Sequence, residues 1–232
     1  MFKTVLIANR GEIAARIART LRKMEIRSIA VYSDPDRSSP HVTLADFAVS
    51  LPGNSASDTY LRSDLIIAAA KARQAEAIIP GYGFLSENAD FAEQCEATGI
   101  TFIGPTPDQM RRFGLKHASR EIAEAAGVPL VPGTGLLTGL DEARTEAERL
   151  GYPVMLKSTA GGGGIGLTRC GNENELVAAF ETVQRLAQNF FKDAGVFLER
   201  CIEDARHVEV QIFGDGHGKV CQRHMRTASI GI

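Results

Sequence analysis

The sequence predicts an α/β protein, with a doubly wound parallel sheet first and the beginning of an α+β domain after it. Three observations support this prediction. Strand and helix patterns alternate over the first hundred residues, the rhythm changes near Thr106, and a glycine-rich hairpin around Gly161–Gly164 interrupts the second half. Alternating strands and helices build parallel sheets, because each crossover helix returns the chain to the edge where the strand began.

Runs of apolar and β-branched residues are predicted to form the strands of the first sheet. They are Lys3–Ala8, Arg27–Tyr32, Phe47–Leu51, Ala77–Ile79 and Thr101–Ile103. In such a sheet, the loops after the carboxyl ends of the strands face the ligand. We therefore expect Asn9–Glu12 and Pro80–Gly83 at the functional edge, and we interpret Arg10 and Glu12 as residues that cap and pin the first helix.

Apolar residues with helical spacing lie between these strands and continue after them. The predicted helices are Ile13–Leu21, Leu65–Ala72 after a capping Ser63, Ala89–Thr98, Pro107–Phe113, Lys116–Ala126, Leu140–Leu150 and Glu173–Ala187. Asn172 is expected to cap the last helix, with Glu175 in a variant of the capping box. Val128–Gly133 is predicted to be an extended connector, and strands Val196–Glu199 and Arg206–Phe213 complete the second half.

The composition is that of a core-forming protein without a strong electrostatic field. The 232 residues are 44% hydrophobic and 23% charged, and the formal net charge is −2. This balance predicts no attraction to nucleic acid or to an acidic membrane surface. The opening residues lack the apolar core and cleavage site of a secretory signal, and the apolar runs are too short to span a bilayer.

The cysteines, Cys95, Cys170, Cys201 and Cys221, are widely spaced and form no C-x-x-C pair. This spacing argues against a structural zinc site and against a disulfide scaffold. Cys95 lies among helix-patterned residues and is expected to be a small buried side chain. The cysteine usage favours a cytoplasmic location, with the mitochondrial matrix as an alternative.

The most informative segment is an apolar run that ends at Lys157 and leads into Gly161–Gly164 and Gly166. Consecutive glycines lack Cβ atoms, so several backbone N–H groups can approach one anion. A lysine at the end of the preceding strand adds a positive charge on the same side. The combination favours a polyphosphate ligand.

Four interpretations of this hairpin compete. A Walker phosphate loop has its lysine after the glycines and a helix behind it, whereas here Lys157 comes first and Leu167–Gly171 is strand-like. A dinucleotide-binding fingerprint also requires a following helix. A flexible surface linker rarely lies inside one hairpin with a lysine at its mouth. We therefore favour a mobile lid that closes over the phosphates of ATP.

Several motifs, in one consistent order, resemble the biotin carboxylase family of ATP-grasp ligases. They are IANRGEIA at Ile7–Ala14, PGYGFLSEN at Pro80–Asn88, FIGP at Phe102–Pro105 and RHVEVQ at Arg206–Gln211. The resemblance covers almost the whole chain, from about Phe2 to Val220. It implies a Rossmann-like, pre-ATP-grasp domain over 1–113 and a partial ATP-grasp domain over 114–232, with the lid at about 129–200.

Within this family, the chain is similar to the urea carboxylase (urea amidolyase) branch. Ile165 follows the four glycines where the acetyl-CoA carboxylase branch has arginine, and Gly114–His117 and Asp193–Arg200 point the same way. The resemblance implies a ligase reaction in which ATP and bicarbonate give a carboxyphosphate-like intermediate. Carbon dioxide is then transferred to N1′ of biotin on a carrier domain. In the urea branch, the carboxyl group passes on to urea in a separate domain.

The resemblance also implies a set of ATP contacts: Lys116, Lys157, Gly163, Gly164, Glu199, Arg200, Cys201, Ile202 and His207. The two lysines match phosphate-binding lysines, and the two glycines match lid residues whose N–H groups approach the phosphates. Glu199 through Ile202 match the hinge that receives adenine and ribose. On spacing alone, Lys116 is more simply a solvated lysine, Glu199 an exposed strand-end acid and His207 a structural histidine.

Two further carboxylates have open interpretations. Glu209 shares a strand face with His207, because side chains alternate along a strand. The family places its Mg²⁺ carboxylates later in the chain, so neither residue is assigned as a metal ligand. Glu87 fits the cleft near the nucleotide and biotin, and a role in stabilising its own loop fits equally well.

Family residues that would follow Val220 are missing from the sequence: the bicarbonate lysine, the glutamates that hold Mg²⁺, and the arginine–glutamate set that activates bicarbonate and biotin. We therefore expect this chain to be an incomplete portion that does not carboxylate biotin by itself, with no catalytic residue assigned in it. The expected partners are ATP, bicarbonate, biotin on a carrier domain and, in a homodimer, a second copy.

Three alternatives remain at this point. One is the biotin carboxylase part of an acetyl-CoA, propionyl-CoA or pyruvate carboxylase. Another is a truncated homologue that binds a nucleotide or a partner subunit without ligase activity. A nicotinamide-dependent oxidoreductase is less favoured, because the first strand leads into Asn9–Glu12 and not into a glycine fingerprint.

Overall fold

The computed structural model describes residues 1–159, 166–191 and 195–228 of the chain. It divides into two compact units, Met1–Val128 and Pro129–Ile232. Each unit has a hydrophobic core of its own and is described by itself. Among the described residues, no helix is both long and apolar enough to cross a lipid bilayer.

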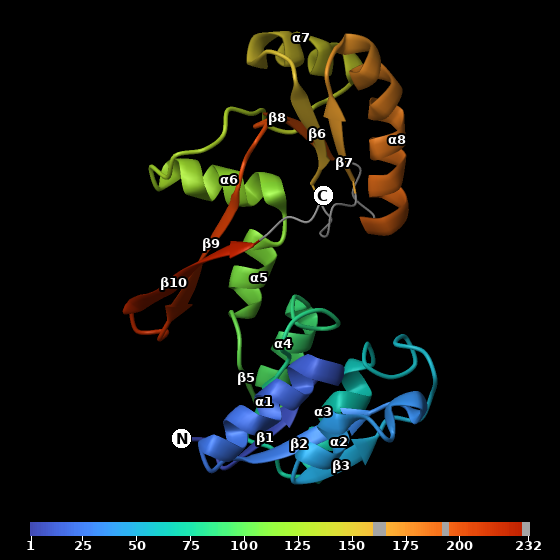
Figure 1. Ribbon diagram of the computed structural model, residues 1–232, viewed down its shortest axis with the longest axis vertical. Helices are drawn as coiled ribbons and strands as arrows, with labels where there is room; N and C mark the ends of the chain where they lie inside the picture. The colour runs from blue at the N-terminus through green and yellow to red at the C-terminus, as the bar shows by residue number, and fades with distance from the viewer. Residues whose placement is uncertain (160–165, 192–194, 229–232) are drawn as a thin grey trace. The chain divides into compact units, whose positions relative to one another are not determined.

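The first unit is built on a five-stranded parallel sheet with the order β3-β2-β1-β4-β5 (Figure 1). Its strands are β1 (Thr4–Ile7), β2 (Arg27–Tyr32), β3 (Phe47–Ser50), β4 (Ala77–Ile79) and β5 (Thr101–Phe102). Every pairing in this sheet is parallel, which confirms the predicted doubly wound α/β class. The strand order reverses between β1 and β4, and such sheets bind ligands at the crevice formed by the loops after those two strands.

Helices cover both faces of this sheet. They are α1 (Gly11–Lys23), α2 (Pro40–Leu44), α3 (Ser63–Ala72) and α4 (Ala89–Ala97), with a 3₁₀ turn at Asp34–Asp36. Two further helices follow the last strand: α5 (Pro107–Phe113), which packs on α4, and α6 (Lys116–Ala125), which has no buried residue. Val5 and Ile7 pack with α1 on one face, whereas Leu6 packs with α3 and α4 on the other, and all three are 0% exposed. Successive side chains of a strand point to opposite faces, so a strand covered on both sides must be apolar throughout.

Two details of these helices differ from expectation. Ser63 does not cap α3, because it is the first residue of the helix and Arg62 is the N-cap without a side-chain cap hydrogen bond. Arg62 instead pairs with Asp64 in the first turn, at 2.6 Å. The short helix α2 is absent from the predicted elements, although Pro40 at its first position is a common helix start.

The second unit contains two separate sheets. The first has the order β7-β6-β8, from β6 (Val154–Ser158), β7 (Leu167–Cys170) and β8 (Val196–Arg200), and both of its pairings are antiparallel. The second is the hairpin of β9 (His207–Gly214) and β10 (Val220–Ala228). Helices α7 (Leu140–Leu150) and α8 (Glu173–Phe191) pack against one face of the three-stranded sheet, around a core that includes Leu156, Leu176 and Leu198.

The predicted cap of α8 is confirmed. The Glu175 N–H donates to Asn172 Oδ1 at 3.0 Å, and the Glu175 carboxylate accepts from the Gly171 N–H at 2.7 Å and from Asn172 Nδ2 at 2.8 Å. Reciprocal bonds of this kind satisfy helix N–H groups that have no partner within the helix.

Candidate functional site

The three-stranded sheet of the second unit carries polar side chains on the face that points away from α7 and α8. The ladder pairs Lys157 with Leu167, and Met155 with both Arg169 and Glu199. Residues opposite each other in a ladder, and residues two apart in one strand, project to the same side. We call Met155, Lys157, Leu167, Arg169 and Glu199 the polar face.

A salt bridge joins two of the predicted site residues on the polar face. Lys157 Nζ donates to Glu199 Oε2, and the side chains are 25% and 14% exposed. Lys157 lies opposite Phe197 in the ladder, so Glu199 is its diagonal neighbour, within reach of a long side chain. Because both groups are largely removed from water, their attraction is screened less than that of a surface pair.

A second salt bridge joins Arg169 of the polar face to the turn after β8 and is more exposed. Arg169 Nη2 lies 2.6 Å from Glu203 Oε1, and these side chains are 49% and 59% exposed. Exposed pairs contribute little to stability, because water screens them and two long side chains lose rotational freedom. The Lys157–Glu199 pair is therefore the stronger electrostatic feature of this face.

The base of the glycine hairpin shows why a glycine is needed at Gly166. Its φ is +76°, and a Cβ placed there would lie 2.4 Å from Ser158 Oγ. The Ser158 N–H donates to the Gly166 carbonyl at 2.8 Å, which closes the two strands of the hairpin just beyond Lys157. The predicted lid residues Gly163 and Gly164 lie outside the described residues.

The predicted hinge residues after Glu199 have structural partners. The Arg200 guanidinium donates to the Leu150 carbonyl at 3.0 and 2.7 Å, at the end of α7 and away from the polar face. The Arg200 N–H donates to Pro132, at 2.8 Å, and the Cys201 N–H donates to Pro153, at 2.9 Å. The side chain of Ile202 is exposed. The backbone of this segment is therefore well anchored.

The remaining predicted residues lie elsewhere. Lys116 is the first residue of α6 and belongs to the first unit, whereas Lys157 and Glu199 belong to the second. His207 is the first residue of β9, and its side chain is outside the described part of the structure. Glu87 is exposed in the turn before Asn88, which caps α4 by accepting the Phe91 N–H at 2.8 Å.

At the strand reversal of the first unit, the end of β1 carries a buried residue that no sequence pattern singled out. Asn9 is 3% exposed and donates from Nδ2 to the carbonyl groups of Pro80 and Tyr82, both at 2.7 Å. These bonds fasten the loop after β4 to the end of β1. The feature of the sequence that could have indicated Asn9 is its amide side chain just after a predicted strand, together with the glycine-rich loop Pro80–Gly83 after another predicted strand.

The Arg10 side chain does not cap α1, contrary to expectation. Arg10 occupies the N-cap position, but its side chain makes no hydrogen bond to the helix. Its guanidinium instead lies 3.1 Å from Asp36 Oδ2 and over the ring of Tyr60. Tyr60 Oη donates to the same carboxylate at 2.6 Å, and Ser33 Oγ donates at 3.0 Å. No local sequence pattern indicates this cluster, because Asp36 and Tyr60 are brought together only by packing.

The pKa values of Asp36 and Tyr60 in this cluster are shifted in opposite directions. Burial alone raises the pKa of Asp36, but the hydrogen bonds from Tyr60 and Ser33 and the charge of Arg10 outweigh it and hold that pKa below its usual value. Burial, together with the bond to Asp36, raises the pKa of Tyr60 to about 12. Asp36 is therefore a carboxylate and Tyr60 a phenol near neutral pH.

Comparison with known families assigns both halves of the chain. Residues 1–110 match the family described as "Biotin carboxylase, N-terminal domain", and residues 116–230 match "Carbamoyl-phosphate synthase L chain, ATP binding domain".

The chain belongs to the biotin carboxylase family.

Curated relatives of the chain include a urea amidolyase and a bacterial biotin carboxylase. It is 60% identical over 229 residues to a urea amidolyase of Lachancea kluyveri, an alignment that covers 99% of this chain and 12% of the relative. It is 47% identical over 231 residues to biotin carboxylase 2 of Bacillus subtilis, with coverage of 99% and 52%. The chain thus spans about half the length of the bacterial biotin carboxylase and a smaller part of the urea amidolyase.

Solved structures agree with the fold. The biotin carboxylase domain of Hydrogenobacter thermophilus 2-oxoglutarate carboxylase, a dimer in complex with MgADP, ADP and bicarbonate, has a TM-score of 0.93 and 44% identity, with coverage of 100% of this chain and 51% of that one. A biotin carboxylase from Campylobacter jejuni has a TM-score of 0.92 and 41% identity, with coverage of 96% and 50%.

The family match extends further than the sequence motifs indicated. The resemblance was expected to end near Val220, but the ATP-binding family matches up to residue 230. The physical reason is that Val220–Ala228 forms β10, which continues the hairpin with β9. The alternation of residues in a strand can match a family even where no short motif is recognisable.

Among the described residues of this biotin carboxylase chain, no group of three or more His, Cys, Asp or Glu side chains is placed to hold a metal ion. The polar face as defined has one carboxylate, that of Glu199, and it is paired with Lys157.

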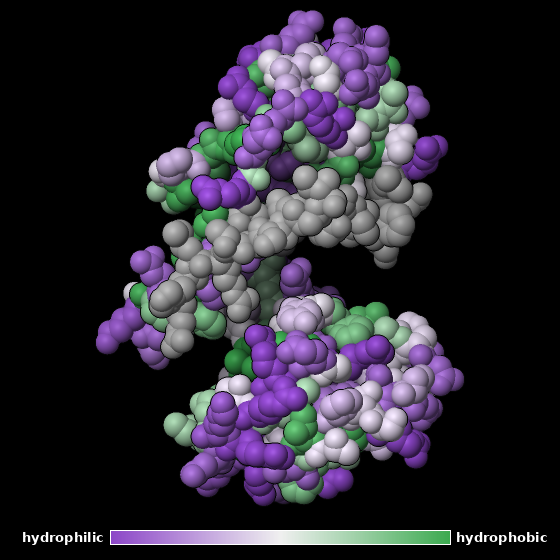
Figure 2. All heavy atoms as spheres, in the orientation of Figure 1, coloured by the Kyte–Doolittle hydropathy of each residue, from purple (hydrophilic) through white to green (hydrophobic). Residues whose placement is uncertain are grey.

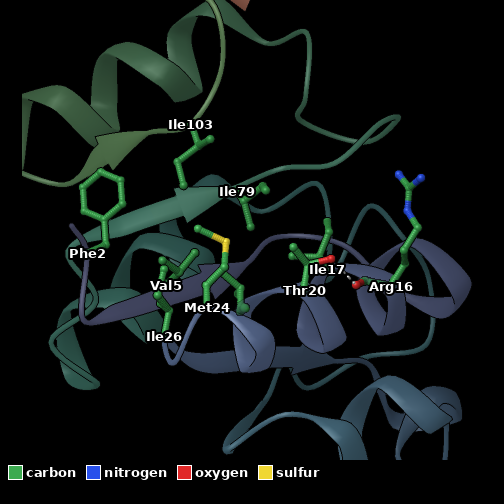
Figure 3. A pocket seen from close by; sticks show the side chains of 10 residues that line it. Phe2, Val5, Arg16, Ile17, Thr20, Met24, Ile26, Ile79 and Ile103 are labelled. Atoms are coloured by element: carbon green, nitrogen blue, oxygen red, sulfur yellow. Dashed lines mark hydrogen bonds between the residues drawn. The ribbon is translucent and has the colours of Figure 1, made fainter. Parts of the chain in front are cut away.

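An apolar groove of about 450 Å³ lies in the first unit, beside α1. Figure 3 shows its side chains turned toward a common space, and they include Phe2, Val5, Ile17, Met24, Ile79 and Ile103. The groove contains none of the predicted nucleotide residues, and its lining suits an apolar surface better than a polyphosphate. On the face seen in Figure 2, hydrophilic residues predominate and hydrophobic residues form smaller areas between them.

Proposed function

We propose that this chain supplies the nucleotide-binding part of a biotin carboxylase, an ATP-grasp ligase that uses ATP and bicarbonate to carboxylate biotin. The observation that carries this proposal is the Lys157–Glu199 pair on the polar face, at the end of β6, where the glycine hairpin begins. The match of residues 116–230 to an ATP-binding family supports it.

The chemistry of the polar face suits the substrate. The phosphates of ATP carry several negative charges, and phosphoryl transfer is accelerated mainly by positioning and by neutralising charge. Lys157 would meet that charge, and backbone N–H groups of the glycine hairpin would add donors. The carboxylate of Glu199 would accept hydrogen bonds from the ribose hydroxyls. Lys116 and His207 complete the proposed contacts, as the family resemblance implies.

ATP would then give its terminal phosphoryl group to bicarbonate, forming a carboxyphosphate-like intermediate and ADP. This intermediate would release inorganic phosphate and carbon dioxide, and the carbon dioxide would bond to N1′ of biotin on a carrier domain as N1′ loses its proton. Mg²⁺ accompanies the nucleotide in a solved relative, as MgADP. We assign no Mg²⁺ ligand to the described residues, because they contain no suitable cluster.

We further propose that the carboxyl group is finally transferred to urea. The identity to urea amidolyases, 60%, exceeds the 48% identity to the α subunit of a methylcrotonoyl-CoA carboxylase from Glycine max. Carboxylation assays of the longest natural form of the protein, with urea and with acyl-CoA acceptors, test this. Activity on an acyl-CoA without activity on urea would contradict it.

Assembly, location and domain limits remain proposals as well. We propose a homodimer, supported by the dimeric biotin carboxylase domain of Hydrogenobacter thermophilus. We propose a cytoplasmic location, supported by four cysteines that are all free thiols. We also propose that the ATP-grasp domain begins near Gly114, supported by the start of the ATP-binding family match at residue 116.

Substitution of Lys157 tests the nucleotide site directly. The Lys157→Ala variant should bind ATP at least about tenfold more weakly, because loss of a charged hydrogen-bond donor costs roughly 1.5–3 kcal/mol. Isothermal titration of the 232-residue chain with ATP measures this. Lys219→Ala, which removes the same charge from the exposed end of the β9–β10 hairpin, is the matched control and should bind like the wild type. Equal affinity of the wild type and Lys157→Ala would overturn the proposal.

A further inference from the structure

We propose that one face of the β9–β10 hairpin is a docking surface for the other half of a biotin carboxylase, and that this half docks there even as a separate polypeptide. The observation behind the proposal is a row of exposed apolar side chains on a two-stranded sheet. None of these side chains belongs to a proposed nucleotide contact, so the inference does not depend on ATP binding.

The hairpin has one apolar face. Val208, Val210 and Ile212 alternate along β9, and the ladder places Val220 of β10 on the same side of the sheet. These four side chains, which we call the docking face, are 48%, 46%, 62% and 70% exposed in that order. The intervening Gln211 projects to the opposite side.

No other element of the described structure covers the docking face. Its residues belong to none of the hydrophobic clusters, and among the described residues β9 and β10 pair only with each other. A two-stranded hairpin is only marginally stable in water unless a further strand or a helix packs on its apolar face. Because apolar residues at every second position are typical of a sheet with one buried face, the pattern indicates that another protein layer covers this one.

The lengths of the relatives identify what that layer is. The chain covers 51% of the Hydrogenobacter thermophilus domain and 52% of biotin carboxylase 2 of Bacillus subtilis, so about as much sequence again lies outside the alignment in each. The chain matches the fold of the aligned half with a TM-score of 0.93. A half that has its native fold exposes the surfaces that face the other half. The unpaired strand edges of the hairpin also suit a partner that adds a strand to it.

A second copy of the chain fits the docking face less well. The eight residues of β9 and the facing part of β10 span roughly 250 Å², from the rise per residue and the spacing between strands. A stable dimer buries about 800 Å² on each copy. The other half of a biotin carboxylase is about as long as this chain and can cover further apolar surface, such as the groove beside α1.

Co-expression tests the inference. The 232-residue chain is produced together with an affinity-tagged polypeptide that contains the part of Bacillus subtilis biotin carboxylase 2 outside the alignment. We expect the wild-type chain to co-purify with it in equimolar amounts. Val210→Asp should weaken this association at least about tenfold, because it places an ionised carboxylate in an apolar interface.

Two control variants should co-purify like the wild type. Val128→Asp makes the same substitution at a side chain that is 51% exposed and lies outside the hairpin. Gln211→Asp places the same charge on the opposite side of β9. Because Val210 is exposed, Val210→Asp should also have the same urea midpoint as Val128→Asp when each chain is produced alone, which separates loss of docking from loss of folding.

A further measurement needs no substitution. Amide hydrogen exchange of residues 207–214 should slow at least about tenfold when the wild-type chain is in the complex, because exposed backbone N–H groups become covered. The inference is overturned if the wild type forms no complex, if Val210→Asp co-purifies as well as the wild type does, or if exchange in the hairpin is unchanged. A dimer of the chain alone that Val210→Asp dissociates, seen by light scattering, would assign the docking face to a second copy and overturn it as well.

Discussion

His41 is a fully buried histidine beside the Asp36 cluster, at 0% exposure. Its Nε2 lies 3.3 Å from the Val31 carbonyl, and its Nδ1 has no hydrogen-bond partner among the described residues. Burial lowers the pKa of His41, and the charge of Arg10 lowers it further, against the opposing effects of the Val31 carbonyl and the Asp36 carboxylate. The native state therefore disfavours protonation of this ring.

This arrangement predicts a loss of stability in mild acid. Because the folded pKa of His41 lies below the value of about 6.5 for an unfolded chain, the unfolded state takes up a proton first as the pH falls. The free energy of unfolding should decrease from about pH 7.5 to 5.5, with a slope from this residue of at most about 1.4 kcal/mol per pH unit. Urea titrations followed by circular dichroism at several pH values measure that slope.

The matched variant is His41→Gln, which removes the titrating ring and leaves every other histidine in place. Its stability at pH 7.5 falls for packing reasons, so the informative quantity is the pH dependence alone. We expect a smaller slope in the variant. Equal slopes in the two proteins would show that His41 does not cause the acid sensitivity.

For single residues, the sequence predicts the surroundings of a side chain well when its contacts come from residues nearby in the sequence. Cys95 was expected to be a small buried side chain, and it is 0% exposed, with burial raising the pKa of its thiol to about 11. The interpretation of Arg10 as a helix cap was wrong, because its partner Asp36 lies 26 residues away in the sequence, the difference between positions 36 and 10. A partner that distant leaves no local pattern.

Among the elements, the β6–β7 hairpin depends on one glycine. Gly166→Ala should destabilise the second unit by about 2–4 kcal/mol, because the substitution combines a positive φ with a Cβ that would lie 2.4 Å from Ser158 Oγ. The position is buried, so little relaxation is available. Denaturant unfolding monitored by circular dichroism measures the loss.

Gly216 provides a matched control for the hairpin. Its φ is +73°, close to the +76° of Gly166, but a Cβ there would meet nothing within 4 Å. Gly216→Ala should therefore cost only the conformational strain, about 1–2 kcal/mol. If Gly166→Ala and Gly216→Ala lower the free energy of unfolding equally, the contact with Ser158 is not the cause of the loss in Gly166→Ala.

Elements with strong periodicity were predicted well, and irregular ones were not. Helix α7 begins and ends at the predicted residues, and each strand of the first sheet lies within one or two residues of its prediction. Helix α8 continues to Phe191, beyond the predicted Ala187, and α2 was missed. A helix as short as α2 has too few turns to show an apolar stripe, so tertiary contacts decide whether it forms.

At the scale of the whole molecule, the two units have separate hydrophobic cores. We therefore predict that the first unit, Met1–Val128, folds independently of the second. The buried clusters of Met1–Val128 contain residues of that unit alone. The fragment 1–128 should therefore unfold cooperatively in urea, with the circular dichroism of an α/β domain before the transition.

A destabilised variant of the same fragment, Phe91→Ala, is compared with the unsubstituted fragment in the urea titration. Phe91 is 1% exposed and packs edge-to-face with Phe102, at a centroid distance of 5.9 Å. Its loss should lower the stability by about 3–5 kcal/mol and shift the urea midpoint downward. A gradual, non-cooperative loss of signal in the unsubstituted fragment would contradict independent folding.

The sequence by itself determined the α/β class, the family, most helix and strand limits, and the importance of Lys157 beside a glycine hairpin. These properties depend on motifs and on periodicities within a few neighbouring residues. The tertiary structure alone decided the strand order β3-β2-β1-β4-β5, the Asn9 bonds to the Pro80–Tyr82 loop, and the salt bridge between Lys157 and Glu199. Those two side chains are 42 residues apart, and only the register of β6 against β8 makes them neighbours.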